Sequence, residues 1–163
     1  MLQSLTLQQI RRLKEFKQSL HIRWSDLDPN GHVRHSVYYD FAAQLRTELF
    51  IANNIKVEDM AKLGIGPILF EEKASFKREL HFGDDLTMTA WVKGLRKDYS
   101  RFAFIHEIWR GDTLCATVEV LGAWINLRER KLAIPPAEFI TKFEHFPLHA
   151  DFAWMPEKQP SKS

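Results

Sequence analysis

Residues 26–41 read DLDPNGHVRHSVYYDF, and this stretch decides how the fold is interpreted. It combines two carboxylates, a Pro-Asn-Gly turn and two histidines just ahead of a periodic apolar segment. In the preceding residues 20–24, apolar and polar side chains alternate, which indicates a strand. After Ser36, apolar side chains recur every three or four residues, as on one face of a helix. The pattern therefore predicts a strand, a turn that carries Asp28, and a helix from about residue 36 to residue 52.

The predicted position of Asp28 brings a carboxylate close to free backbone amides. The first N–H groups of a helix have no intrahelical acceptor, and the helix dipole makes that end positive. A carboxylate there can handle a proton or attack a carbonyl group while the amides hold an oxyanion. The residues alone leave a second interpretation open, because Asp-Pro-Asn-Gly is also an ordinary turn-forming sequence.

Length and composition set the broad class of the protein. With 163 residues, the chain is expected to form one domain, residues 1–163. A net charge of +2 is too small to indicate nucleic-acid binding, and no apolar run approaches the length of a membrane span. The single cysteine, Cys115, excludes an intramolecular disulfide, which fits a reducing compartment. We therefore expect a cytoplasmic protein without a membrane span.

Beyond the helix, the sequence predicts mostly antiparallel strands. A Gly-Ile-Gly-Pro loop at residues 64–67 precedes four strand-like segments, and Gly111-Asp112 gives a hairpin signal between the last two. These segments are residues 68–80, 86–92, 101–110 and 113–127. A short amphipathic helix is expected within residues 1–20, and a C-terminal extension, residues 137–163, is expected to add a short helix, an irregular strap and a flexible end. The layout is α+β, with the long helix against one sheet face.

In these elements the sequence resembles the hotdog-fold thioesterases, specifically the 4-hydroxybenzoyl-coenzyme A thioesterase-like branch with its acyl-CoA and acyl-carrier-protein relatives. The residues that carry the resemblance are Asp28-x-x-Gly31-His32-Val33 and a tyrosine at position 38 or 39. The resemblance covers about residues 18–136. It implies a hotdog fold, a curled antiparallel sheet wrapped around one long central helix. It also implies a homodimer or homotetramer with the active cleft between protomers.

The resemblance further implies the roles of the motif residues. Asp28 would be the catalytic carboxylate, acting as nucleophile or as general base for water, with Gly31 and His32 shaping the site. The backbone N–H near His35 would polarise the thioester oxygen. Many relatives carry Asn-Asn after Gly-His-Val, whereas this chain has Arg34 and His35. The His35 side chain therefore has an alternative role, in contact with substrate or a neighbouring subunit.

Five further residues are candidates for substrate binding, each with a plainer alternative. They are Asp26, Tyr38, Tyr39, Glu72 and Arg101. Asp26 points the same way as Asp28 in an extended chain, and its like charge would raise the pKa of Asp28. Alternatively, Asp26 is a structural hydrogen-bonding group. The two tyrosines are pocket wall or core. Glu72 shares the parity of the apolar side chains of its strand, or faces solvent at a sheet edge. Arg101 belongs to a group of cations that would meet the phosphates of coenzyme A, or is simply solvated.

The sequence predicts an acyl-CoA thioesterase that acts on a fatty or aromatic acyl group and needs no cofactor. His32 and His35 are three residues apart, but structural zinc usually takes four nitrogen or sulfur ligands and the chain has one cysteine. We therefore expect no metal. Three alternatives stay open: an acyl-ACP thioesterase, a hotdog hydratase or dehydratase that uses a histidine with Asp28, and a non-catalytic acyl-CoA-binding sensor.

Overall fold

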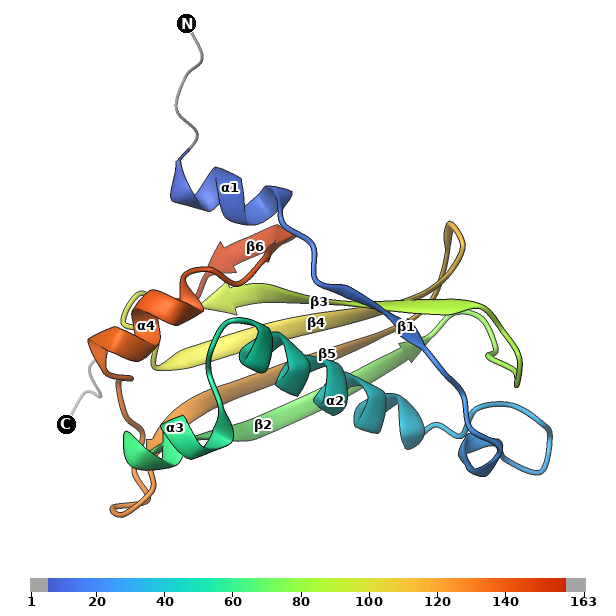
Figure 1. Ribbon diagram of the computed structural model, residues 1–163, viewed down its shortest axis with the longest axis horizontal. Coiled ribbons are helices and arrows are strands. Elements are labelled where there is room, and N and C mark those ends of the chain that lie inside the picture. Colours follow the sequence, from blue (N-terminus) through green and yellow to red (C-terminus); the bar gives the residue numbers. More distant parts are fainter. Residues whose placement is uncertain (1–5, 158–163) are drawn as a thin grey trace, which may run out of the picture.

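One long helix, α2 (Val37–Ala52), lies along one face of a six-stranded sheet (Figure 1). The computed structural model describes residues 6–157. Besides α2, the helices are α1 (Leu7–Leu13), α3 (Val57–Lys62) and α4 (Ala137–Phe143), and a 3-10 turn spans Trp24–Asp26. The strands are β1 (Lys17–Leu20), β2 (Ile65–Phe76), β3 (Leu86–Leu95), β4 (Arg101–Arg110), β5 (Thr113–Asn126) and β6 (Leu148–Trp154).

The sheet has the order β1-β3-β4-β5-β2, with antiparallel neighbours throughout. The outer edge of β3 is shared by two strands. β1 pairs with its first half, where Leu20 lies opposite Leu86, and β6 runs parallel to its second half, where Leu148 lies opposite Val92. β2 forms the opposite edge of the sheet, and within residues 6–157 no strand pairs with its far side. The antiparallel layout around α2 agrees with the expected hotdog fold.

The core lies between α2 and the concave face of the sheet. On β4, alternate side chains such as Phe102 and Phe104 point toward the helix and are fully buried. The Phe50 ring of α2 contacts two of the core rings: its centroid lies 6.1 Å from that of Phe104 and 4.9 Å from that of Phe146. Because Phe146 follows α4, the aromatic cluster ties the C-terminal extension to the central helix.

Several predicted boundaries were wrong. The expected strand at residues 20–24 ends at Leu20, because its partner strand β3 begins opposite that residue, and Trp24 is 77% exposed. The expected loop at residues 64–67 belongs to β2, since residues 65–67 pair with β5. That strand ends at Phe76 rather than at residue 80. The expected irregular strap is the regular strand β6.

The long helix and the hairpin were predicted correctly. Ser36 occupies the N-cap position of α2, which ends at Ala52, and Gly111 lies in the turn between β4 and β5 with a φ of 56°. The predicted N-terminal helix is α1. The C-terminal end predicted to be flexible lies outside the described residues. Within residues 6–157, no helix has the length and apolar character needed to cross a membrane.

A histidine is buried in the middle of the sheet, on the face toward α2. His106 has no exposed surface, and its Nδ1 lies 3.1 Å from the carbonyl oxygen of Val118. Because a carbonyl only accepts hydrogen bonds, Nδ1 of His106 carries the hydrogen in the neutral ring. Nε2 then offers only a lone pair, and it has no hydrogen-bond partner among the described residues. Burial lowers the pKa of His106 to about 3, and the positive charge of Arg46 adds to this effect.

His106 should therefore make the protein sensitive to acid. Its pKa rises from about 3 in the folded state to an ordinary value near 6.5 in the unfolded chain. As the pH falls below 6.5 only the unfolded chain takes up this proton, so stability falls by up to about 1.4 kcal/mol per pH unit. When the free energy of unfolding is measured with urea at several pH values between 7 and 4, it should fall less steeply with decreasing pH in His106→Asn than in the wild type. His145→Asn, at an exposed histidine, is the control, and equal slopes in all three proteins would contradict the assignment.

Candidate active site

The Asp28 turn is built by its own backbone and side chain. The Asp28 N–H donates to the His32 carbonyl at 2.8 Å, and the Gly31 N–H donates to the Asp28 carbonyl at 3.0 Å. Carboxylate oxygen Oδ1 of Asp28 accepts from the N–H of Asn30 at 2.8 Å and of His32 at 3.2 Å. Gly31 has a φ of 78°, a left-handed conformation that glycine adopts without strain. One oxygen of the half-buried carboxylate thus anchors the turn, while Oδ2 has no hydrogen bond to the described residues.

The turn is fastened to the connection between β2 and β3. The Val33 N–H donates to the Leu80 carbonyl at 2.9 Å, and His32 forms an isolated antiparallel bridge with His81. The two imidazole rings meet edge to face, with centroids 5.0 Å apart. His32 Nε2 also lies 3.3 Å from a carboxylate oxygen of Glu79. The ring of His32 is therefore held by this connection and its backbone by Asp28.

Asp26 fixes the chain on either side of the turn, through contacts with Arg23 and Arg34. Its side chain is buried and accepts from the Arg23 backbone N–H at 2.8 Å and from the Arg23 guanidinium at 2.8 Å. Hydrogen bonding from Arg23 holds the pKa of Asp26 below its ordinary value. The Arg34 N–H donates to the Asp26 carbonyl at 2.9 Å. These contacts favour the structural alternative for Asp26, and its contact with substrate stays a prediction.

The start of α2 lies beside the same turn. Ser36 makes no side-chain capping hydrogen bond, and the first N–H of the helix, that of Val37, donates to the Arg34 carbonyl at 3.0 Å, so only the N–H groups that follow it are without a cap. His35, just before the helix, is exposed. Burial raises the pKa of the Tyr38 phenol to about 12, and the Asp28 carboxylate adds to this rise. The phenol in the first turn of α2 and the carboxylate are therefore within electrostatic range of each other.

The two tyrosines of α2 differ in their surroundings. Tyr38 is buried, and its ring meets Phe76 of β2 edge to face at 4.9 Å. Tyr39 is partly buried and packs against the core. Both positions agree with a wall of the site or core, and substrate contact stays a prediction for each.

A mostly apolar cavity of about 330 Å³ lies between α2, α3 and β2. Its walls include Phe50, Met60, Leu69 and Phe102, with Arg46 as the charged exception. The Arg46 Nη1 is buried and has no hydrogen-bond acceptor among the described residues. A cavity of this size and character suits an acyl or aryl group.

Glu72 shares the sheet face that borders this cavity. In the β2–β5 ladder it lies opposite Val120, which is buried beneath α2. Its side chain is exposed, and although burial lowers the pKa of Arg46, the negative charge of Glu72 partly offsets this effect. The parity inferred from the sequence therefore agrees with the register, while substrate binding by Glu72 stays a prediction.

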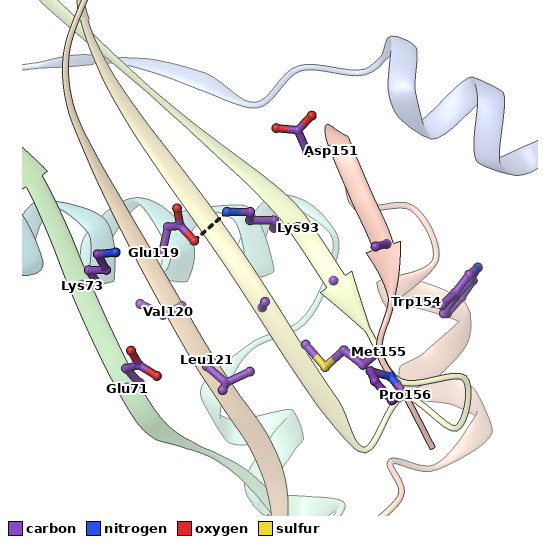
Figure 2. Close-up of a pocket in the computed structure, with 13 residues that line it drawn as sticks. Glu71, Lys73, Lys93, Glu119, Val120, Leu121, Asp151, Trp154, Met155 and Pro156 are labelled. Atoms are coloured by element: carbon purple, nitrogen blue, oxygen red, sulfur yellow. Dashed lines mark hydrogen bonds and ion pairs between the residues drawn. The ribbon is translucent and has the colours of Figure 1, made fainter. Parts of the chain in front are cut away.

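A second hollow, of about 460 Å³, lies on the opposite face of the sheet. Figure 2 shows it from that side, with α2 behind the strands. Lys93 and Glu119 form an ion pair of 2.6 Å across its floor. Arg101 has the same parity on β4 as Ala103, which lines this hollow, and its guanidinium lies 5.3 Å from the Phe70 ring centroid. Arg101 is thus on the other sheet face from α2, and the structure does not group it with Asp28.

Comparison with known proteins identifies the family. Residues 22–143, well over half of the chain, match the Thioesterase-like superfamily. The chain belongs to this superfamily. Two curated relatives share 26% identity with it. The alignment to the Bacillus subtilis (strain 168) protein YneP, named for a predicted acyl-CoA thioesterase activity, covers 55% of this chain and 62% of that protein. The alignment to the chloroplastic acyl-acyl carrier protein thioesterase ATL3 of Arabidopsis thaliana covers 82% of this chain and 70% of that protein.

The fold of this protein also matches that of a solved structure. The hypothetical protein SAV2348 from Staphylococcus aureus, in complex with CoA, superposes with a TM-score of 0.74. The two chains are 21% identical, and the match covers 91% of this chain and 90% of the other. At this identity the likeness supports the hotdog fold and carries no assignment of residues.

Sequence reasoning missed the residues that come to the site from β2, from α2 and from the β2–β3 connection. Phe76, Glu79 and His81 contact the motif residues from positions that lie more than 35 residues away in the chain. Arg46 lies on the predicted helix, where a single charged residue gives no sign of facing a cavity. Packing of α2 on β2 brings Phe76 to Tyr38, and the bridge between His32 and His81 brings His81 and Glu79 to the turn, so no local pattern marks these residues.

The Asp26 contacts predict a measurable loss of stability. Asp26→Asn should lower the free energy of unfolding by about 1.5–3 kcal/mol, the range for hydrogen bonds to a charged group. Because the pKa of Asp26 is depressed, its contribution is present above the ordinary value of 3.8 and is lost as the pH falls through the lowered pKa. Urea unfolding at pH 7 and pH 3 should thus show a smaller difference from wild type at pH 3. Asp112→Asn, at an exposed carboxylate, is the matched control; a similar loss in both variants would contradict a specific role.

Proposed function

We propose that this protein hydrolyses the thioester bond of an acyl-CoA to give the free acid and coenzyme A. The observation that carries the proposal is the Asp28 carboxylate, anchored through Oδ1 in a turn beside the uncapped start of α2. The names of both curated relatives refer to thioester cleavage, with coenzyme A as carrier for one and acyl carrier protein for the other. Because the first of these alignments spans less than two thirds of the relative, the activity rests on the site geometry as much as on the likeness.

In the proposed mechanism, Asp28 is the general base. Its free Oδ2 takes a proton from a water molecule, whose oxygen adds to the thioester carbonyl carbon. The N–H groups at the start of α2 donate to the oxyanion that develops on the carbonyl oxygen. When the tetrahedral intermediate collapses, the C–S bond breaks and the leaving thiolate takes the proton back from Asp28. Atoms and charge balance without a cofactor.

The acyl group would occupy the apolar cavity between α2, α3 and β2. The cavity begins at Ala43, six residues or about 9 Å along the helix axis from Val37 at the start of α2. An acyl chain whose thioester lies at the helix start would reach the cavity by running along α2. Supporting this placement, the cavity wall is apolar except at Arg46 and Thr47.

We propose that the working enzyme is a homodimer or a larger homo-oligomer with the cleft between protomers. The far edge of β2 has no strand partner within residues 6–157. The same strand exposes large apolar side chains: Leu69 is 40%, Phe70 is 49% and Phe76 is 53% exposed. An unpaired edge with apolar side chains favours pairing with another chain. A second copy at this edge would lie next to both the cavity and Phe76.

Thiol release from short, medium, long and aromatic acyl-CoAs tests the activity. Asp28→Asn should lower kcat by about a hundredfold or more, the scale of a lost general base. Asparagine keeps an acceptor oxygen for the N–H groups of Asn30 and His32, so the turn should persist and unfolding should change little. Asp112→Asn, at the exposed β4–β5 turn, serves as the matched control and should retain wild-type activity.

Two further outcomes are informative. A folded wild type that releases no thiol from any acyl-CoA would overturn the coenzyme A proposal, and acyl-ACP substrates would then be assayed. A single turnover in H₂¹⁸O tests for nucleophilic attack by Asp28. General-base catalysis places the label only in the product acid, whereas label in the Asp28 carboxylate would show an anhydride that water opens at the Asp28 carbonyl, and Asp28 would then be a nucleophile.

The cavity assignment predicts a change in chain-length preference. Ala43→Phe adds a ring to the cavity wall and should reduce kcat/KM for long acyl-CoAs by about tenfold or more, since one to two kilocalories of lost apolar contact correspond to this factor. Short acyl-CoAs that end before Ala43 provide the internal control and should be hydrolysed at the wild-type rate. An equal loss for short and long substrates would place the acyl group elsewhere.

A further inference from the structure

The structure brings together three metal-ligating side chains next to the Asp28 turn. His32, Glu79 and His81 each offer one ligand atom, and these atoms all lie within 4.8 Å of one another. A Glu79 carboxylate oxygen lies 3.3 Å from His32 Nε2 and 3.9 Å from His81 Nε2. We propose that His32, Glu79 and His81 form a binding site for a divalent transition-metal ion, with Zn²⁺ as the best-matched ion.

Two of the three ligand-atom separations are close to those of tetrahedral coordination, and the third, between the two histidines, lies within 4.8 Å. Zn²⁺ binds histidine nitrogen and carboxylate oxygen at about 2.0–2.2 Å, which places neighbouring ligand atoms of a tetrahedron roughly 3.4 Å apart. The His32–Glu79 separation already has this value, and the His81–Glu79 separation exceeds it by about half an ångström. Three protein ligands leave the fourth position for water or another small ligand. Imidazole and carboxylate ligands are typical of zinc and of its first-row neighbours.

The backbone holds the three ligands in place. His32 and His81 are opposite each other in an antiparallel bridge, so their side chains leave the backbone on the same side. Glu79 lies two residues before His81, and its carboxylate lies 3.9 Å from His81 Nε2 and 3.3 Å from His32 Nε2, which places it on that same side. The Val33 N–H bond to the Leu80 carbonyl, 2.9 Å long, fixes the register of the two segments. Little reorganisation of the backbone is therefore required.

A second carboxylate lies behind the outer histidine. Asp84 Oδ2 accepts from the His81 backbone N–H at 2.9 Å and lies 3.9 Å from His81 Nδ1, the ring nitrogen away from Glu79. Arg110 in turn contacts the same oxygen at 3.0 Å. In a metal site, a carboxylate that accepts a hydrogen bond from the outer ring nitrogen fixes the ring and raises its basicity, and a shift of about 1 Å would bring Asp84 to that distance. This arrangement is independent of the three ligand atoms themselves.

The proposal differs from the expectation drawn from the sequence, which considered His32 with His35. His35 is not one of the three residues that the structure brings together. His81 is 49 positions from His32 in the chain, and only the bridge between their segments makes them neighbours. The inference does not depend on thioesterase activity, because none of its observations involves substrate.

Calorimetric titration of tag-free protein with Zn²⁺ tests the site. The wild type should bind one ion per chain with a dissociation constant in the micromolar range. His81→Ala and Glu79→Gln should each weaken binding by about tenfold or more, and Glu79, being exposed, can be changed without loss of folding. His145→Ala removes an exposed histidine elsewhere and should bind as the wild type does. Co²⁺ should give the visible absorption of a tetrahedral complex in the wild type and lose it in His81→Ala.

Three outcomes would overturn the proposal. The wild type could show no saturable Zn²⁺ binding. Alternatively, His81→Ala and Glu79→Gln could both bind as tightly as the wild type while remaining folded by circular dichroism. Finally, a loss of affinity in His145→Ala equal to that in His81→Ala would place the ion outside this site. Thiol release by the same preparations reports separately on the proposed hydrolysis.

Discussion

The hydrogen bond from the Val33 N–H to the Leu80 carbonyl, 2.9 Å long, is the constraint on which the functional end of the molecule depends. It joins the segment before α2 to the connection between β2 and β3. One such bond contributes only about 0.5–1.5 kcal/mol, but here it sets the register of a whole segment. With it in place, His32 pairs with His81 and the Asp28 turn closes on itself. The start of α2 is then fixed beside that turn.

The other end of α2 is held by apolar packing instead. Phe50 contacts rings from β4, β5 and the C-terminal extension, among them Phe104, Trp124 and Phe146. This cluster fixes the helix against the sheet without help from a side-chain cap at its first turn. Arg11 adds a polar tie, since its buried guanidinium donates to the Phe146 carbonyl at 2.8 Å. Apolar contacts therefore hold this end of the helix, whereas backbone hydrogen bonds hold the end near Asp28.

Local patterns in the sequence predicted the local parts of this structure. The three- and four-residue spacing after Ser36 located α2, and Gly111-Asp112 located the last hairpin. Both features depend on residues close together in the chain. Strand ends depend on distant partners: β1 ends at Leu20 because β3 begins opposite it, and β2 starts at Ile65 because β5 extends to Asn126. β6 was not predicted as a strand, because polar residues interrupt its apolar pattern and its partner strand, β3, is more than 50 residues away in the chain.

The same distinction applies to the candidate site. Asp28 and Gly31 belong to one turn, and their arrangement follows from the local sequence. Arg23 lies three residues before Asp26, so their ion pair had a local signal in the Arg-x-x-Asp spacing. Glu79 and His81 had none, because only pairing register brings them to His32.

His32 belongs to both groups, and this links them energetically. Its backbone N–H donates to the Asp28 carboxylate at 3.2 Å, while its ring lies 3.3 Å from Glu79. A ligand that needs the bridge between His32 and His81 stabilises the turn that carries Asp28. By thermodynamic reciprocity, a ligand that needs the Asp28 turn raises the protein's affinity for the ligand that needs the bridge, and by the same factor. The coupling is favourable when the proposed coordination shell closes without moving His32. Glu79 is 66% exposed and its long side chain can rotate, so it supplies the adjustment and His32 stays on the turn. Occupancy of the three ligands and order in the Asp28 turn should therefore rise together.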